Sequence, residues 1–301
     1  MARTRIVPLD LNFQGSPRAI ASYLIRHSDG AVLIESGPGS TIDSLRAGLA
    51  ANHLAPADIT HVLLTHIHLD HAGAAGWLAS QGAQIFVHPI GAPHMVNPGK
   101  LLESAGRIYG DRMLTLWGEF LAVPESRITA PQDEEEIVVG GLRFLPMDTP
   151  GHANHHYAYL FEDTCFSGDV GGVRIGPARY LRVPMPPPEL HMGKWRASLA
   201  RLRRARMSQI APTHFGFYDD PEWQLRAVEQ ALDETERWLE ASMAMSPALD
   251  DLRQLFTHWM SEQAMQQNLD VDTARAYELA NPPGMSADGL FRYWNKVRQG
   301  T

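Results

Sequence analysis

Four residues with nitrogen or oxygen donors lie within one short stretch of this chain, directly after an apolar run. The stretch is Thr65-His66-Ile67-His68-Leu69-Asp70-His71. Three more donors, His152, Asp169 and His214, each follow a short apolar run of their own. Neutral imidazole and ionised carboxylate both carry the lone pairs that metal ions require. Together these side chains are enough to hold two metal ions.

The spacing of these donors suggests how they divide between two ions. His66 and His68 are two positions apart on an extended segment, so their side chains project to the same side. Asp70 and His71 follow where the chain turns into a helix, and can therefore serve a second ion. Asp169 has two carboxylate oxygens and can bridge two cations, while His152 and His214 can complete one ion each. Two such ions about 3.5–4 Å apart can hold a shared hydroxide and polarise a substrate oxygen.

The surrounding pattern predicts two domains, a strand-rich catalytic domain at residues 1–218 and an all-helical C-terminal domain at residues 219–301. The predicted strands cover residues 19–25, 31–35, 61–64, 85–88, 142–146, 157–161, 164–166 and 209–211. Predicted helices of the first domain cover residues 41–53, 71–80, 100–120 and 194–206. The second domain is predicted to contain helices at residues 221–245, 247–267 and 270–279, and a last short helix carrying Phe291 to Trp294.

Composition narrows the class of protein. The chain has 301 residues and a formal net charge of −8, which argues against a nucleic-acid partner, since such a partner usually needs a basic surface. The one cysteine, Cys165, excludes an internal disulfide. We see no secretory signal and no run as long as a membrane span. We therefore expect a cytoplasmic protein that contacts neither nucleic acid nor a membrane. The net charge does not count against a small-molecule substrate, which is the partner we expect.

The seven donors make the chain resemble the metallo-β-lactamase fold superfamily of metallo-hydrolases, and most of all its glyoxalase II-like group of thioesterases and lactonases. The resemblance covers residues 5–216. It implies an α+β fold, a four-layered αββα sandwich with the metals at one edge of the two sheets. It also implies one metal site at His66, His68 and His152 and another at Asp70, His71 and His214, bridged by Asp169. Asp70, His71 and Asp169 are the candidate catalytic residues, and the resemblance implies that Asp70 also orients the attacking hydroxide.

Two stretches depart from the pattern of the family. The usual Asp-Thr-Gly turn after the second strand is replaced by Glu35-Ser36-Gly37, which leaves the support of the site from beneath open. The third ligand is followed by Ala153-Asn154-His155-His156. His156 keeps the trailing histidine of the family and is expected to support a ligand. For His155 we weigh a place in the pocket against a surface or structural place, and favour the latter.

The ligand set favours hydrolysis of an activated acyl bond, a thioester or lactone, by the metal-bridging hydroxide. In family members that are true β-lactamases the bridging carboxylate is typically absent and a cysteine ligand is common, so β-lactam hydrolysis is a weaker alternative. Phosphodiesterases share the full ligand set and remain open, as does a metal-binding regulatory protein with little turnover. Histidine and carboxylate ligands suit zinc, iron and manganese, and we expect zinc.

The parts that contact the substrate are less clear from the sequence. The basic stretch Lys194 to Arg206 is either a solvated helix face, which we favour, or an anchor for an anionic substrate. The stiff loop Pro184 to Pro188 and the aromatic tail at Tyr293 and Trp294 could wall the pocket, although simple packing is the favoured interpretation of the tail. A homodimer is an expectation that comes only from the family.

Overall fold

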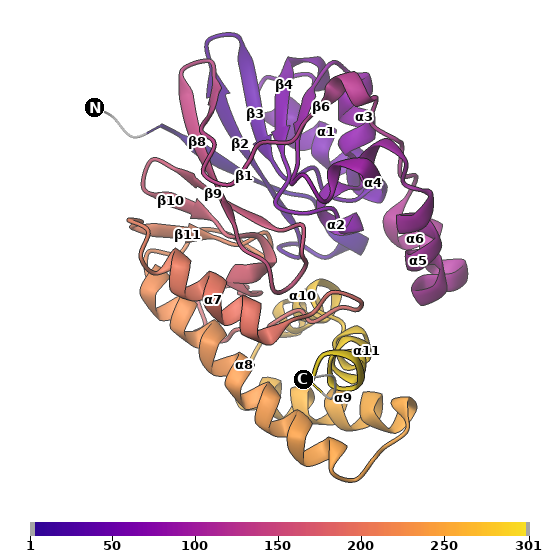
Figure 1. Ribbon diagram of the computed structural model, residues 1–301. Helices are drawn as coiled ribbons and strands as arrows, with labels where there is room; N and C mark the ends of the chain where they lie inside the picture. The colour runs from indigo at the N-terminus through magenta and orange to yellow at the C-terminus, as the bar shows by residue number, and fades with distance from the viewer. Residues whose placement is uncertain (1–3, 299–301) are drawn as a thin grey trace.

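The computed structural model describes residues 4–298 and contains two β-sheets that pack face to face. The six-stranded sheet contains, in order, β1 (Ile6–Asp10), β2 (Ala21–His27), β3 (Gly30–Ile34), β4 (Ile59–Leu63), β5 (Gln84–Phe86) and β6 (Ile128–Thr129). The five-stranded sheet contains, in order, β11 (Gln209–Ala211), β10 (Thr164–Phe166), β9 (Tyr157–Phe161), β8 (Leu142–Asp148) and β7 (Ile137–Val139). Figure 1 shows the first sheet in indigo and purple and the second in pink and orange.

Helices cover the outer face of each sheet, so the predicted αββα sandwich is confirmed (Figure 1). The first sheet packs against α1 (Ile42–Ala51), α3 (Ala75–Ser80), α4 (Ala92–Val96), α5 (Gly99–Tyr109) and α6 (Met113–Trp117). On the side of the second sheet lie α7 (Met192–Leu202) and α8 (Pro221–Met243), and α9 (Leu249–Met265) and α11 (Pro283–Tyr293) extend the same buried cluster. The remaining helices are α2 (Leu69–Ala72), at the sheet edge, and α10 (Val271–Ala280), and the described chain ends with the turn Trp294–Arg298.

Alternation along the strands explains why the sheets stack. Tyr23 and Ile25 of β2 belong to the core between the sheets, whereas Leu24 belongs to the core under the helices. Successive side chains of a strand point to opposite faces, so a strand that is apolar at every position must be covered on both sides. The same division holds in β3, where Val32 and Ile34 face inward. This sheet is therefore an inner layer, with helices on one face and the second sheet on the other.

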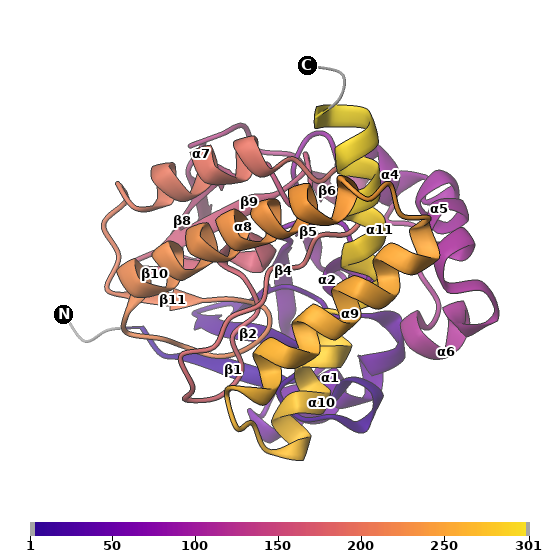
Figure 2. The ribbon, with the colours of Figure 1, turned by 90° about the horizontal axis from the view of Figure 1, so that it is seen from below.

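The helices after β11 share cores with the sandwich. Leu225 and Leu232 of α8 lie in one buried cluster with Cys165 of β10 and Ile210 of β11. Tyr277 of α10 lies in the cluster that contains the helices of the first sheet. Figure 2 shows α8, α9 and α11 from below, with α9 and α11 crossing beneath the rest of the molecule. The division into domains at residue 218 stays a prediction.

Several predicted elements need correction. The single helix expected at residues 100–120 is wrong, because the chain leaves α5 at Gly110, where φ is +52°, and α6 ends before Gly118, where φ is +68°. Glycine adopts this left-handed conformation without the steric cost of a Cβ atom. Strands β1, β6 and β7 were not predicted, because they are short or, in β1, half-exposed and interrupted by Pro8. Helices α8, α9 and α10 lie within two residues of their predicted ends.

None of the helices among residues 4–298 combines the length and the apolar character that crossing a membrane requires.

Candidate metal centre

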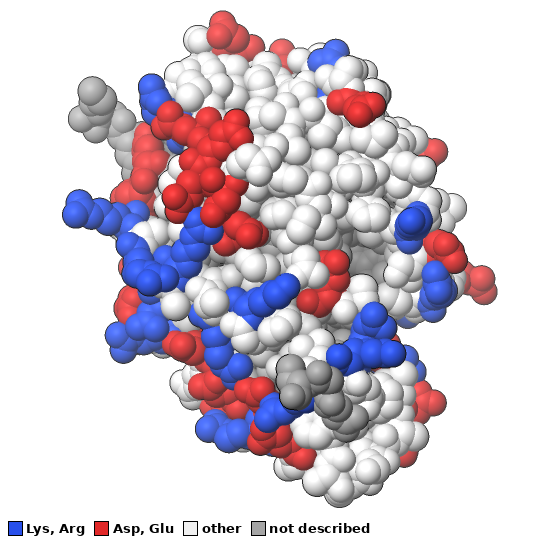
Figure 3. All heavy atoms as spheres, viewed as in Figure 1, with Lys and Arg blue, Asp and Glu red and all other residues white. Residues whose placement is uncertain are grey.

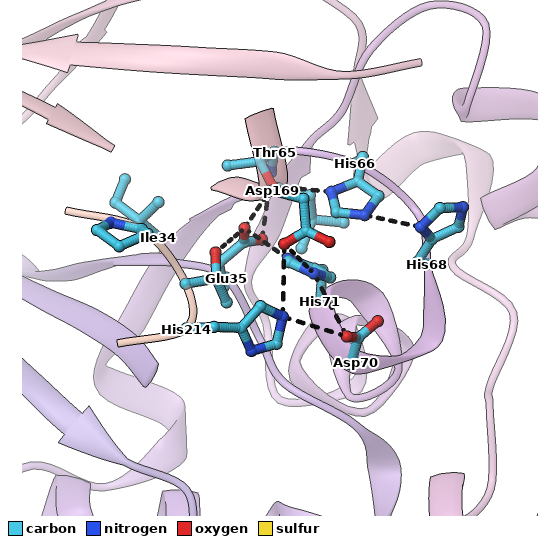
Figure 4. Close-up of polar contacts among 12 residues, drawn as sticks. Ile34, Glu35, Thr65, His66, His68, Asp70, His71, Asp169 and His214 are labelled. Atoms are coloured by element: carbon cyan, nitrogen blue, oxygen red, sulfur yellow. Dashed lines mark hydrogen bonds and ion pairs between the residues drawn. The ribbon is translucent and has the colours of Figure 1, made fainter. Parts of the chain in front are cut away.

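All seven predicted ligands lie at one edge of the sandwich, where strands of both sheets end. His66 and His68 follow β4, Asp70 and His71 are in α2, and the other three follow strands of the second sheet: His152 after β8, Asp169 after β10 and His214 after β11. Figure 4 shows six of them, all but His152, with the donor atoms of the cluster directed at one another. His66 and His214 are 148 positions apart in the sequence. They meet because each follows a strand that ends at this common edge.

The first group of donors consists of three histidines. The His66 Nε2 and the His152 Nε2 atoms each lie 2.9 Å from the His68 Nδ1 atom. His66 and His152 are buried, and His68 is half-buried. Three ring nitrogens that converge in this way can share one cation.

The second group combines two histidines and a carboxylate. The Asp70 Oδ2 atom lies 3.5 Å from the His71 Nε2 atom and 3.5 Å from the His214 Nε2 atom. The Asp70 side chain is 20% exposed, whereas both rings are buried. Asp70 is therefore the member of this group that faces the opening of the site.

Asp169 lies between the two groups and offers one oxygen to each. Its Oδ1 atom is 3.3 Å from the His71 Nε2 atom and 3.4 Å from the His214 Nε2 atom. Its Oδ2 atom is 3.3 Å from the His152 Nε2 atom. This is the arrangement that a carboxylate bridging two cations requires.

The hydrogen bonds of three histidines leave the metal-facing nitrogen free. The Nδ1–H groups of His71, His152 and His214 donate to Glu35 Oε1 at 2.9 Å, to the Pro184 carbonyl at 2.9 Å and to the Ala19 carbonyl at 2.7 Å. Since a carbonyl oxygen only accepts, the Nδ1 atoms of His152 and His214 carry protons, and their Nε2 atoms are the ones that face Asp169.

Buried polar atoms without a hydrogen-bond partner mark the same site. Among the described residues they include His71 Nε2, His214 Nε2 and Asp169 Oδ1. Buried polar groups are normally satisfied, so these atoms point to a missing partner. Separations of 2.9–3.5 Å between donor atoms also fit ligands bonded to one ion at about 2.0–2.2 Å. The residues therefore fit two divalent cations.

Charge and burial distinguish the two groups before any metal binds. Burial lowers the pKa of His66 and His68 well below the ordinary value, and neighbouring histidines lower it further. Burial also acts to lower the pKa of His214, but the carboxylates of Asp169 and Asp70 outweigh it and raise that pKa to about 9. The pKa of His71 is raised for the same reason, with Glu35 as a further contributor. The first group is therefore neutral at pH 7, whereas the second holds protons that a metal must displace.

Glu35, which stands where the family has an aspartate, organises the floor of the site. Its fully buried carboxylate accepts hydrogen bonds from the Thr65 hydroxyl, from the Thr65 N–H at 3.2 Å, from the Thr213 hydroxyl at 3.0 Å and from His71 Nδ1 (Figure 4). The adjoining turn binds the same helix, because the Ser36 N–H and hydroxyl both donate to the His71 carbonyl. Glutamate therefore takes over the supporting role that the sequence left open.

Two further histidines pack against the ligands. His155 is buried rather than on the surface, with its ring centroid 5.5 Å from that of His68 and its Nε2 atom 3.5 Å from Glu189 Oε2. His156 is fully buried, its ring centroid is 5.1 Å from that of His66, and its Nδ1 atom shares a hydrogen bond with the Thr149 hydroxyl. Thr65 and Thr213 were missed by sequence reasoning, although each directly precedes a ligand histidine.

The basic stretch in and after α7 is engaged with acidic neighbours. Arg196 pairs with Asp233 and Glu236, Arg201 with Asp133 and Glu134, and Arg203 with Glu222 and Glu229. These three arginines are paired with acidic side chains of the protein itself. They are therefore not free to anchor an anionic substrate, the alternative considered from the sequence. In the tail, Tyr293 is buried and Trp294 is partly buried in the core of the second sheet. The tail therefore packs, as favoured from the sequence.

We predict that Glu35→Gln weakens metal binding about 10- to 100-fold, the range found when an outer-shell partner of a ligand is lost. The neutral amide would place an NH₂ group where a carboxylate oxygen now accepts the Thr65 N–H. Competition with a chromophoric chelator measures the affinity. Glu103→Gln, at an exposed glutamate paired with Arg107 in α5, is the control and should bind as the wild type does. Wild-type affinity in Glu35→Gln would contradict the prediction.

We also predict that an ion bound at the group of Asp70, His71 and His214 releases more protons than an ion bound at the group of three histidines. His71 and His214 must lose protons to coordinate, since their pKa values are raised, whereas His66, His68 and His152 have lowered pKa values and are already neutral. Affinity at the second group should fall as the pH drops below about 9. Calorimetric titration at pH 7 in buffers of different ionisation enthalpy counts the protons; equal release for both ions would refute this assignment.

Comparison with known proteins places the chain in a family. The sequence pattern of the metallo-beta-lactamase superfamily matches residues 15–216. A metallo-beta-lactamase fold-containing protein of Sulfurisphaera tokodaii is 27% identical over 162 residues, which are 52% of this chain and 61% of that protein. An atrochrysone carboxyl ACP thioesterase of Aspergillus fumigatus is 30% identical over 152 residues, 50% of this chain and 39% of that enzyme. The matched regions thus span less than two thirds of these curated relatives.

Solved structures share the fold. A metallo-beta-lactamase family protein of Thermus thermophilus aligns with a TM-score of 0.63 at 21% identity, over 98% of this chain and 93% of that one. An archaeal superfamily protein from Sulfolobus tokodaii aligns with a TM-score of 0.62 at 23% identity, over 76% of this chain and 86% of that one. With the pattern match covering residues 15–216, the chain belongs to the metallo-beta-lactamase superfamily.

Proposed function

We propose that this protein is a dinuclear metal-dependent hydrolase that cleaves an activated acyl bond, a thioester or a lactone, in a small molecule. The position of Asp169, with one oxygen at each group of donors, is the observation that carries the proposal. Two divalent cations held there, zinc being our expectation, would lower the pKa of a bound water and polarise a carbonyl oxygen. The thioesterase relative supports an acyl substrate.

The residues of the chain supply positioning and proton handling. His66, His68 and His152 form a neutral, buried side of the site, and Asp169 brings negative charge between the two groups. Asp70 faces the opening, and His71 and His214 lower its pKa to about 2 against the opposing effect of burial. It is therefore ionised at neutral pH and can orient a water molecule through its free oxygen.

Tyr109 adds a hydroxyl close to Asp70. Burial raises its pKa, and the charge of Asp70 raises it further, so the phenol stays protonated. The hydroxyl contacts the Met285 Sδ atom of α11 at 3.4 Å, and thioether sulfur is a weak acceptor. A substrate oxygen would be a better acceptor, and we propose that the Tyr109 hydroxyl donates to the substrate. Figure 3 shows a hollow in the surface between the α5–α6 arm and the C-terminal helices, on the side where Figure 1 places α2.

We expect His66→Ala and Asp169→Ala to lower kcat/KM by about a thousandfold or more, a loss of about 4 kcal/mol of transition-state stabilisation. Each removes a ligand, so elemental analysis should also show less bound metal. His258→Ala, at an exposed histidine of α9, is the matched control. Full activity with full metal content in either ligand variant would overturn the assignment of the site.

A panel of thioesters, lactones, phosphodiesters and β-lactams, assayed with metal-replete wild-type protein, tests the reaction class. Turnover should be fastest on a thioester or lactone. Preference for a phosphodiester or β-lactam would replace the proposal with that reaction. A lack of turnover on every compound would favour a regulatory metal-binding protein.

We expect Tyr109→Phe to lower kcat on the best substrate of the panel about tenfold, with unchanged metal content. Loss of one hydrogen bond that forms more strongly in the transition state removes about 1.4 kcal/mol. The ring contact with Trp117, at 5.0 Å between centroids, is retained in this variant, so the fold is kept. Tyr293→Phe, at a buried tyrosine of α11, serves as the control. An unchanged kcat would remove Tyr109 from the mechanism.

A further inference from the structure

We propose that the C-terminal helices hold the two metal groups separately, through two buried hydroxyls that act as positioning residues. Ser286 of α11 supports the group that contains His152, and Tyr277 of α10 supports the group that contains His214. This inference rests on the metal-binding part of the proposed function, and not on the reaction or the substrate.

The route from Ser286 to His152 passes through one peptide unit. The His152 Nδ1–H donates to the Pro184 carbonyl at 2.9 Å, and the N–H of the same peptide unit, that of Met185, donates to the Ser286 hydroxyl at 3.2 Å. The Ser286 hydroxyl in turn donates to the Asn281 side chain at 2.8 Å. The direction of the carbonyl that fixes the His152 ring is therefore set by a helix hydroxyl.

Close packing also holds the next peptide unit of this loop against α11. A Cβ atom added at Gly289 would lie 1.9 Å from the Met185 carbonyl oxygen, so the helix reaches the loop only because position 289 has no side chain. Arg292 Nε donates to the Pro188 carbonyl at 3.1 Å. The loop at residues 184–188 is thus fixed to the helix along its length.

The route from Tyr277 to His214 reaches the backbone of the histidine rather than its ring. The Arg174 N–H donates to the His214 carbonyl at 2.6 Å, and the Phe215 N–H donates back to the Arg174 carbonyl at 2.9 Å. The N–H of the next residue, Ile175, donates to the Tyr277 hydroxyl at 2.9 Å. Tyr277 is fully buried, and its hydroxyl donates to the Tyr180 carbonyl at 2.9 Å.

Charged contacts hold this second loop on α10. The buried Arg182 guanidinium binds Glu278 at 2.8 Å and lies over the Tyr277 ring, 5.5 Å from its centroid. Arg182 and Val173 exchange two backbone hydrogen bonds, which join the two ends of the loop at residues 173–182. Because Arg182 binds Glu278 of α10, both ends of this loop are held on that helix. The two routes use different helices, different loops and different ligands. They predict effects that are selective for one metal group, which general destabilisation would not produce.

The test uses the full-length protein loaded with two equivalents of ¹¹³Cd²⁺ and observed by ¹¹³Cd NMR. The group of three histidines and the group that contains Asp70 should give separate signals. Tyr277→Phe should shift or broaden the signal of the Asp70 group and weaken that site about tenfold, whereas Ser286→Ala should do the same to the histidine group. Loss of an outer-shell partner typically weakens metal binding by this factor or more.

Matched controls separate positioning from packing. Tyr293→Phe removes the hydroxyl of a buried tyrosine in α11, and Ser242→Ala removes that of a buried serine in α8; both should leave the two signals unchanged. Ser286→Thr keeps a hydroxyl and should restore the histidine-group signal. Thermal unfolding with and without metal shows whether each variant is folded.

Unchanged signals in both folded variants, or equal changes at both sites in each, would overturn the inference. If one variant does not fold, the other still decides its own route. A wild-type protein that binds two ions and hydrolyses nothing on the panel would end the proposed reaction and leave this inference intact. Selective changes in the ¹¹³Cd signals would therefore support the inference even if the protein hydrolysed none of the panel substrates.

Discussion

The carboxylate of Glu35 is the interaction on which the rest of the site depends. A fully buried anion is costly unless hydrogen bonds and opposite charge compensate it, and Glu35 meets this requirement with donors from three different segments. Thr65 follows a strand of the first sheet, Thr213 follows a strand of the second, and His71 belongs to the helix between them. One side chain thus links the two sheets at the edge where the candidate ligands lie, and it bonds one of them, His71, directly.

The remaining ligands follow the same logic with backbone partners. The Pro184 and Ala19 carbonyls orient His152 and His214, so main-chain geometry rather than side-chain choice determines which nitrogen faces the site. Asp169 then lies within reach of both groups, with one oxygen for each. Burial and neighbouring histidines lower the pKa values of His66 and His68, whereas the nearby carboxylates raise the pKa values of His71 and His214. Two similar sets of donors thereby acquire different proton affinities.

The fold class and the ligand cluster were predictable because their signals are local. Apolar runs that end in His66, Asp169 or His214 predict strands whose ends carry donors, and the structure brings those ends together. Features that depend on tertiary contacts were not predictable. The break at Gly110 looks like one tolerated glycine within a helical pattern, the partners of Arg196 lie on another helix, and nothing near Ser286 in the sequence indicates that it binds Met185. Glu35 was visible as a substitution, but its four donors were not.

The hydrogen bond between His214 and the Ala19 carbonyl joins residues 195 positions apart. During synthesis the stretch from His66 to His71 is complete long before His214 exists, so an ion captured early meets only an open, partial set of ligands. An ion at the second group would meet its full set of donors only after the segment before β2 and the segment after β11 have come together. The second group of donors is thus complete only in a chain that has folded as far as His214.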